Sequence, residues 1–476
     1  LPVIDRCTIR EIRFRVSTIR LITTNVMISA NLCCVAAGAL LGWTSPILPK
    51  LQNGVEDNPL GRRITPDENS WIGSLVSVGA MIGSFAAGYL AERCGRKRTL
   101  LLSVVPFLIG WILVATAGVV YQLYAARIIL GIALAFAFTV VPMYCGEITS
   151  VRGALGSFLQ LFVSFGLLYA YCIGPFVSYL VFAILCGIIP VIFVACFFMM
   201  PESPYHLLKI GKRQEAIQAL AWLRCKSPAS VQKEADEMQE RSSKISDLFN
   251  VKANFRALIY TCLLVTFQQC SGINVVLFYM GSIFQAARSA LPDSISTLIV
   301  GSVQVVASMV TPVIVDRLGR RLLLITSGVG EIVSLIALGL YMFLQDVTHS
   351  DVSSISWLPI VSLVIFIAVY CIGWGPLPWT VMGEMFASNV KSKASGITVC
   401  VCWLVSFFIT KFANNLQDIF GQFALFWIFA VFCVASVLFT VLILPETKGK
   451  SLQEIQDVLG GADHSEIPEF GNSSKK

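Results

Sequence analysis

Twelve long apolar runs constrain the fold of this chain more than any other feature of its sequence. Each has about 20 residues and almost no charge, the length an α-helix needs to cross the hydrocarbon core of a bilayer. The runs occupy approximately 27–48, 69–90, 100–120, 123–144, 155–175, 179–200, 257–283, 295–315, 322–344, 357–382, 395–416 and 421–444. The pattern predicts an all-α membrane protein with twelve transmembrane helices.

Two stretches each hold two runs with few polar residues between them. Residues 155–200 need a turn near Gly174-Pro175, and residues 395–444 need one near Asn414-Asn415. Glycine, proline and asparagine are the residues that most often mark turns. We therefore expect a helix to end at each of these points.

The composition excludes other protein classes. Of the 476 residues 56% are hydrophobic and only 13% are charged, whereas a soluble domain carries about 25% charged residues. Intrinsic disorder is excluded and a soluble fold is disfavoured. The net charge of +7 is interpreted by position, because Lys and Arg mark the cytoplasmic side of a membrane protein. No nucleic-acid partner is therefore expected.

The basic residues alternate between the connections. One set of connections holds the N-terminal arginines, Arg93, Arg96, Lys97, Arg98, Arg152, the 202–256 segment, Arg317, Arg320, Arg321, Lys391, Lys393 and the C-terminal tail. The opposite set holds Lys50, Arg62, Arg63, Arg288 and, near a run's end, Lys411. The first set should be cytoplasmic, with both termini inside.

The runs fall into two groups of six. Residues 201–256 form the one substantial polar piece between runs, and we expect short helices there. The expected organisation is a cytoplasmic N-terminal segment (1–26), a six-helix bundle (27–200), the linker, a second six-helix bundle (257–444) and a cytoplasmic tail (445–476).

The two groups of runs also repeat. Glu92-Arg93-Cys94-Gly95-Arg96 recurs 224 residues later as Asp316-Arg317-Leu318-Gly319-Arg320, and Pro201-Glu202-Ser203-Pro204 is echoed by Pro445-Glu446-Thr447. An even number of helices lies between the copies, so the repeat is parallel. Parallel halves related by an axis along the membrane normal are typical of transporters that hold substrate near the midplane.

Little in the sequence suggests metal, cofactor or enzyme chemistry. The fifteen cysteines lie mostly inside apolar runs, as small buried hydrophobes do. There is no C-x-x-C, H-E-x-x-H or phosphate loop, and only three histidines are present. No nucleophile and base occur together outside structural motifs. We expect no catalytic residue, no metal and no cofactor.

The motifs together resemble the sugar porter family of the major facilitator superfamily, over nearly the whole chain. The strings that carry the resemblance are Gly88-Tyr89-Leu90-Ala91-Glu92-Arg93-Cys94-Gly95-Arg96-Lys97, Val141-Pro142-Met143-Tyr144 with Glu147 and Arg152-Gly153, Pro201-Glu202-Ser203-Pro204, Gln268-Gln269-Cys270-Ser271-Gly272-Ile273-Asn274, Asp316-Arg317-Leu318-Gly319-Arg320-Arg321, Gly373-Trp374-Gly375-Pro376-Leu377-Pro378-Trp379 and Pro445-Glu446-Thr447-Lys448-Gly449. Within the family, Leu41-Gly42-Trp43-Thr44-Ser45-Pro46 and Gly373-Trp374-Gly375-Pro376 look most like insect facilitated trehalose and hexose transporters. The resemblance implies a multi-pass plasma-membrane protein whose partners are a sugar and the bilayer, and for which a monomer suffices.

Amides in the seventh run are candidates for sugar binding. A sugar presents hydroxyls and an apolar ring face, which neutral amides and an aromatic plane can match. Gln268, Gln269 and Asn274 supply three amides within one membrane span. The alternative is interhelical hydrogen bonding, worth about 0.6 kcal/mol on average. The resemblance implies that the three contact sugar.

The resemblance extends the candidate site to other runs. Gln160 matches a sugar-binding glutamine, and Gln304 stands where many hexose carriers have asparagine. Trp379 and Trp403 match aromatic walls, although tryptophan is also common in interfacial belts and packed cores. Tyr279 matches an extracellular gate.

Two positions depart from the family pattern. Alignment puts Cys371 where hexose carriers often have a glutamate, so the pocket lacks a strong acceptor and the sugar is left open. The link from Glu147 to Arg152 is a few residues shorter than usual. The loop geometry can differ there while the charges are retained.

Charged residues recur at equivalent cytoplasmic places in both halves. By resemblance they form an interdomain salt-bridge network that closes the inner gate. The set is Glu92, Arg93, Arg96, Glu147, Arg152, Glu202, Asp316, Arg317, Arg320, Glu384, Lys391 and Glu446. Positive-inside anchoring explains the arginines but not the acids among them. Tyr205 replaces the usual arginine after Pro204, which should weaken one half of the network.

The mode of energy coupling is inferred from an absence. Proton-coupled members of the family carry an aspartate in the first helix, where this chain has Leu40. Arg127 therefore lacks a carboxylate partner, and facilitated diffusion is the simplest mechanism. The alternatives are a proton symporter and a non-transporting sensor, the latter disfavoured by the short tail. Glu331 is an acid near mid-membrane, for which an interhelical hydrogen bond is the simplest interpretation.

Overall fold

The N-terminal half of the protein is a bundle of eight helices in the computed structural model, which describes residues 6–53, 58–148, 155–239, 247–287, 291–386, 390–450 and 452–460. These helices are α1 (Arg6–Gly42), α2 (Thr44–Asn53), α3 (Pro66–Arg93), α4 (Arg96–Leu102), α5 (Val104–Ala115), α6 (Val120–Ile148), α7 (Leu155–Ile173) and α8 (Tyr179–Phe197). Pairs such as α1 with α2 and α4 with α5 continue one another across a single residue, so the eight helices make six passes.

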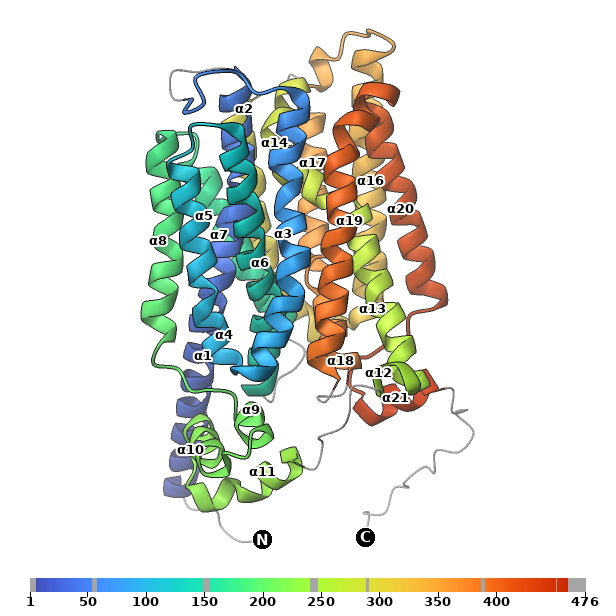
Figure 1. The fold of residues 1–476 in the computed structure, drawn as a ribbon. Coiled ribbons are helices and arrows are strands. Elements are labelled where there is room, and N and C mark those ends of the chain that lie inside the picture. Colours follow the sequence, from blue (N-terminus) through green and yellow to red (C-terminus); the bar gives the residue numbers. More distant parts are fainter. Residues whose placement is uncertain are drawn as a thin grey trace.

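Short helices separate this half from the next. They are α9 (Pro204–Lys209), α10 (Arg213–Arg224), the 3-10 turn η1 (Pro228–Val231), α11 (Gln232–Gln239) and α12 (Asp247–Asn250). Figure 1 shows α9, α10 and α11 at the same end of the molecule as the first turns of α1 and as α21. The polar segment between the halves thus lies beneath one end of the bundle.

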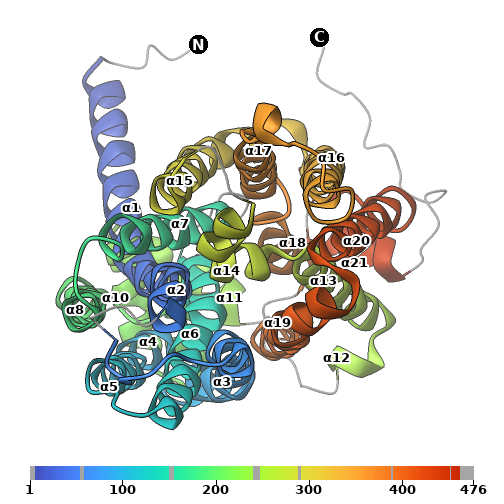
Figure 2. The ribbon, with the colours of Figure 1, turned by 90° about the horizontal axis from the view of Figure 1, so that it is seen from above.

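The C-terminal half repeats the arrangement. Its elements are α13 (Lys252–Cys270), α14 (Ile273–Ala286), α15 (Asp293–Leu318), α16 (Arg320–Asp346), η2 (Ser353–Ile355), α17 (Leu358–Ile372), α18 (Leu377–Met385), α19 (Lys391–Phe420), α20 (Gln422–Leu442) and α21 (Leu452–Gly460). Figure 2 shows α1–α8 gathered on one side and α13–α20 on the other, with α3 beside α19 and α7 beside α15 where the halves meet.

The predicted fold class is confirmed. Eleven helical segments of the described chain are long and apolar enough to cross a membrane, and the shorter segment Ser157–Ile173 occupies the place of the twelfth. The expected turn at Gly174-Pro175 is confirmed, since α7 ends at Ile173 and α8 begins at Tyr179. The protein is therefore an integral, multi-pass, all-helical membrane protein.

The other expected turn is wrong. Helix α19 continues through Asn414 and Asn415 and ends at Phe420. Gly421 follows with φ 88°, a conformation that glycine adopts at far lower cost than other residues. The asparagines lie on the last turns of α19, where Asn415 is exposed, so their amides do not require the helix to end.

Three breaks inside the membrane spans shape the centre of the molecule. Trp43 separates α1 from α2, Ser271 and Gly272 separate α13 from α14, and Gly373–Pro376 separate α17 from α18. Gly272 has φ 81°, and a Cβ there would lie 2.2 Å from the Phe429 ring. Broken helices free backbone carbonyls in a membrane only where protein groups or a cavity can satisfy them.

Candidate functional site

A cavity lies at the centre of the molecule, between the halves. Its volume is about 40 Å³. The N-terminal half contributes Leu41, Phe138, Gln160, Val163 and Leu167, and the C-terminal half contributes Gln268, Gln269, Asn274, Leu277, Tyr370, Trp379, Cys402 and Trp403. Because both halves line it, any relative movement of the halves changes its shape.

The structure brings most of the predicted sugar-binding residues together. Six of the seven predicted residues line the cavity, and they come from α7, α13, α14, α18 and α19. Gln304 on α15 is not among the lining residues. It is fully buried, and neither amide atom has a hydrogen-bond partner among the described residues. Gln304 is therefore a buried polar group outside the cavity lining.

The amides on α13 and α14 hold the site together. Asn274 Nδ2 donates to Gln269 Oε1 at 2.6 Å and to Ser406 Oγ on α19 at 2.8 Å. Gln268 Nε2 donates to the carbonyls of Trp374 at 2.7 Å and Gly375 at 3.0 Å, inside the α17–α18 break. The amides of Gln268 and Asn274 thus do form interhelical hydrogen bonds. These bonds leave Gln268 Oε1 buried without a partner in the described chain, an acceptor available to a hydroxyl.

Aromatic rings from both halves form one wall. Phe138 on α6 lies 5.4 Å from Trp379 and 5.6 Å from Trp403, between ring centroids. These are distances at which tilted and edge-on pairs attract one another. Sequence reasoning missed Phe138 because it stands in a run of apolar residues where nothing distinguishes one phenylalanine from another.

Tyr279 lies on α14 and lines a second cavity, away from α9–α11. The backbone of α14 is kinked there, at φ −112° and ψ 16°. The ring crosses to α3 of the other half, where a Cβ on Gly73 would lie 2.4 Å from the Tyr279 oxygen. The second cavity is also lined by polar residues that include Gln52, Asn69 and Gln422. The role of Tyr279 as a gate remains a prediction.

An ion pair joins the halves at this same end. Lys411 Nζ on α19 lies 2.6 Å from Asp67 Oδ1 and 2.7 Å from Ser70 Oγ on α3. It also lies 4.2 Å from the Trp71 ring centroid. Lys411 is 8% exposed, so its ammonium depends on these partners. The sequence indicated only that Lys411 lies near a run's end.

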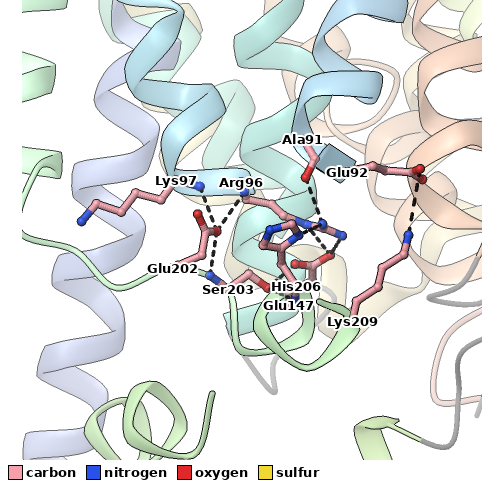
Figure 3. A network of polar contacts seen from close by, with 9 residues as sticks. All are labelled: Ala91, Glu92, Arg96, Lys97, Glu147, Glu202, Ser203, His206 and Lys209. Atoms are coloured by element: carbon pink, nitrogen blue, oxygen red, sulfur yellow. Dashed lines mark hydrogen bonds and ion pairs between the residues drawn. The ribbon is translucent and has the colours of Figure 1, made fainter. Parts of the chain in front are cut away.

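At the opposite end, Arg96 organises the charges of the N-terminal half. Arg96 Nη2 donates to Glu147 Oε1 at 2.7 Å, and Nη1 donates to Ala91 O at 3.1 Å. Glu202 Oε1 accepts from the backbone N–H groups of Arg96 and Lys97 at 2.8 and 3.0 Å. Figure 3 shows these carboxylates converging on the start of α4, where anions stabilise a helix N-terminus.

The C-terminal half repeats the same cluster. Arg320 Nη2 donates to Glu384 Oε1 at 2.8 Å. Glu446 accepts from the N–H groups of Arg320 and Arg321, at 3.1 and 3.0 Å, at the start of α16. Partial burial alone would raise the pKa of Glu446, but backbone donors, with the charge of Arg320, bring it below its usual value. The sequence repeat thus builds the same hydrogen-bonded cluster twice. This cluster, an arginine (Arg96 or Arg320) held by two glutamates at the start of a helix, is the repeated device of the two halves.

Two glycines make this device possible. Gly95 has φ 98° and ψ 162°, and Gly319 has φ 91° and ψ 161°, a region that is essentially restricted to glycine. A Cβ at Gly95 would lie 2.4 Å from Glu202 Oε2, and one at Gly319 would lie 3.0 Å from Glu446 Oε2. Glycine therefore lets the glutamate approach the helix start.

The network differs from the expected interdomain arrangement, because its strong contacts lie within each half. Between described residues at this end, one ion pair joins the halves: Lys393 Nζ on α19 lies 3.9 Å from Glu92 Oε2 on α3. Arg93 stacks on Tyr89, and Lys391 Nζ donates to Gly383 O. Of the other predicted members, the Arg317 carbonyl accepts from Lys448, while Arg152 and the Asp316 side chain lie outside the described residues.

His206 is a member of the cluster that sequence reasoning missed. Its Nδ1 lies 3.2 Å from Arg96 Nη1, and Tyr205 places its ring 6.0 Å from the same guanidinium. Burial, followed by the charge of Arg96, lowers the pKa of His206 below its usual 6.5. The neutral ring therefore accepts the Arg96 hydrogen bond, and two aromatic residues flank the arginine from one short helix.

Arg127 is fully buried in α6 without a carboxylate partner among the described residues. Its Nε donates to Ile72 O at 2.9 Å and its Nη1 to Leu40 O at 3.4 Å. The guanidinium carbon also lies 5.5 Å from the Trp43 ring centroid. Carbonyl dipoles and an aromatic face thus take the place of a counter-ion.

Comparison with known proteins gives the family. The family described as "Sugar (and other) transporter" matches residues 26–459. A facilitated trehalose transporter from Bombyx mori is 35% identical over 87% of this chain and 82% of its own length. The mouse solute carrier family 2 facilitated glucose transporter member 8 is 35% identical over 90% of this chain and 92% of its own.

A solved structure has the same fold. The xylose transporter XylE from E. coli, in a partially occluded inward-open conformation, superposes with a TM-score of 0.75 at 24% identity, covering 90% of this chain and 99% of that one. The twelve spans, the paired halves and the family match together show that this chain belongs to the sugar porter family of membrane sugar transporters.

Proposed function

We propose that the protein carries a hexose, trehalose or both down a concentration gradient by alternating access. The central cavity carries the proposal, because amides and tryptophans from both halves line one small space. Such a lining matches the hydroxyls and ring face of a sugar. Binding need only be weak, since the substrate must also leave.

Two gates serve this movement. Tyr279 and the Lys411–Asp67 pair close the side away from α9–α11. The Glu92–Lys393 pair acts on the other side, while the clusters around Arg96 and Arg320 brace each half as a rigid body. When the halves rock against each other, one gate opens as the other closes. The gating residues thus divide into those that join the halves and those that stiffen them.

Arg127 favours uniport over proton symport. A proton relay through the membrane requires an ionisable group that gains and loses a proton along the route. The residues beside Arg127 offer backbone carbonyls from Leu40 and Ile72 instead of a carboxylate. A guanidinium held in this way has no acid with which to exchange a proton.

Two observations support the proposed substrates: the names of the relatives and the chemistry of the cavity lining. The relatives are named for facilitated transport of trehalose and of glucose. The central lining is neutral, which suits an uncharged sugar. The orientation proposed is the one that the basic residues predict: α9–α11 and both termini face the cytoplasm, and the plasma membrane is the proposed location.

Counterflow in proteoliposomes tests the function. Vesicles loaded with unlabelled sugar receive labelled glucose or labelled trehalose outside. A carrier accumulates label transiently, whereas protein-free vesicles do not. Label that never exceeds the protein-free level for either sugar would contradict the proposal, and accumulation of one sugar alone would identify the substrate.

A further inference from the structure

Glu331 is a buried acid that the proposed transport cycle does not use. It lies on α16, is 1% exposed, and forms no ion pair with any described residue. Its Oε1 lies 3.1 Å from Ser327 Oγ, and Cys433 Sγ on α20 donates to its Oε2 at 3.6 Å. An ionised carboxylate without a cation is costly at this depth.

A count of protons assigns its charge state. Ser327 Oγ also lies 2.7 Å from Val369 O and 3.3 Å from the Trp374 N–H. A hydroxyl donates only once, and the shortest contact is the one to Val369 O. Since the Trp374 N–H is itself a donor, the proton between Ser327 and Glu331 must come from the carboxyl. Glu331 is thus a neutral acid that donates to Ser327, which donates to Val369.

This chain of hydrogen bonds ends at the central site. Trp374 gives its N–H to Ser327 and its carbonyl to Gln268 Nε2, at 3.3 and 2.7 Å. The indole Nε1 donates to Leu324 O on α16 at 3.0 Å. Trp374 is therefore held to α16 on one side and to the cavity wall on the other.

The break allows little adjustment. A Cβ on Gly373 would lie 2.3 Å from the Ser327 Cβ and 2.7 Å from the Leu323 carbonyl oxygen, so α16 packs directly against the break. On the opposite side, a Cβ on Gly375 would lie 3.3 Å from the Gln160 side-chain amide. A shift of Ser327 would therefore reach both Gln268 and Gln160, one from each half.

We propose that Glu331, as a neutral carboxylic acid, is a positioning residue for the sugar site: through Ser327 it fixes Trp374, and Trp374 orients the Gln268 amide. The proposal rests on the proposed sugar transport. Because Glu331 touches no substrate, it affects sugar affinity only by setting the position of the Gln268 amide. The role needs a donor at this position and no charge.

Sugar-uptake kinetics of three variants test this. Glu331→Gln keeps a donor toward Ser327 and should leave the half-saturation concentration within about twofold of the parent. Glu331→Leu and Ser327→Ala each break the chain, and each should raise it about three- to tenfold, as loss of one hydrogen bond implies. The maximal rate per molecule at the surface should change less than the half-saturation concentration.

A matched control lies on the same helix. Ser334 is buried, and its Oγ donates within α16 to Gly330 O at 2.8 Å. Ser334→Ala should therefore leave the half-saturation concentration unchanged. The double variant Glu331→Leu with Ser327→Ala should be no worse than either single, because both remove one pathway. If Glu331→Leu fails to reach the surface, Ser327→Ala carries the test.

Infrared spectroscopy tests the proton independently of transport. The purified protein should show a protonated carboxyl band near neutral pH that Glu331→Gln removes. A normal half-saturation concentration in Ser327→Ala, an equal effect of Ser334→Ala, or no loss of that band in Glu331→Gln would overturn the proposal. Failure of the sugar assignment would look different, because the parent protein itself would not transport.

Discussion

At the scale of single residues, Gln268 has two roles in the candidate site, one structural and one in binding. Its Nε2 binds two carbonyls in the α17–α18 break, and its Oε1 is left without a partner. An amide that uses all its donors on the protein and keeps an acceptor for the ligand is well suited to a sugar hydroxyl. The residue is therefore both a structural link and a binding group.

Replacing Gln268 with alanine should lower sugar uptake about tenfold or more at subsaturating sugar, because a sugar contact is lost and two buried carbonyls lose their donor. The measurement is initial uptake normalised to surface protein. Gln122→Ala is the control, since Gln122 bonds Leu113 and Thr116 near one end of α6, away from the cavity. Normal uptake in Gln268→Ala would show that the site is elsewhere.

His206 should make the protein sensitive to acid. Its pKa is lowered in the folded state, so its contribution to stability is complete above the unfolded value of 6.5 and is lost as pH falls through the folded pKa, below 6.5. His206→Asn keeps an acceptor for Arg96 without titrating. The melting temperature of the parent should fall more than that of the variant on acidification below 6.5. Parallel curves would contradict this assignment.

At the scale of helices, the sequence predicted most of the structure, and its failures have physical reasons. Membrane spans follow from local hydropathy, so the spans were found and the turn at Gly174-Pro175 was correct. The turn predicted near Asn414 and Asn415 was wrong, because polar residues on the last turns of α19 need not end a helix. The resemblance supplied six of the cavity-lining residues. Phe138 and His206 were missed, since only tertiary packing sets them beside Trp379 and Arg96.

The ends of α3 and α19 that lie away from α9–α11 provide a test of the gate. Asp67→Asn removes the counter-charge of the buried Lys411; because Asp67 itself is largely exposed, opening of this side should be favoured by at most about 1 kcal/mol, or about fivefold. Amide hydrogen exchange in α14 and in the first turns of α3 should rise. Arg62→Gln breaks an ion pair to Glu68 within one half and should leave exchange in α14 unchanged. Equal exchange in Asp67→Asn and the parent would contradict the gate.

The start of α4 tests the repeated device. Gly95→Ala places a methyl group against Glu202 in a conformation that costs about 1–3 kcal/mol by itself, so surface expression and melting temperature should fall. Gly211 also has a positive φ, with no atom within 4 Å of an added Cβ. Gly211→Ala should cost less, and the difference reports the clash with Glu202. Equal losses would mean that strain alone explains both.

At the scale of the whole molecule, the same device appears twice and the site once. Each half carries an arginine held between two glutamates, at Arg96 and at Arg320. The cavity draws its lining from both halves. Duplicated rigid bodies around one shared site are what rocking transport requires.

The central claim is that this movement carries a sugar without coupling to protons, and one measurement tests it directly. Proteoliposomes take up labelled glucose and labelled trehalose for hours under an inward proton gradient and again without one. The account predicts that the internal concentration of the transported sugar rises to the external value and stops there under both conditions. Accumulation above the external value that requires the proton gradient would contradict it.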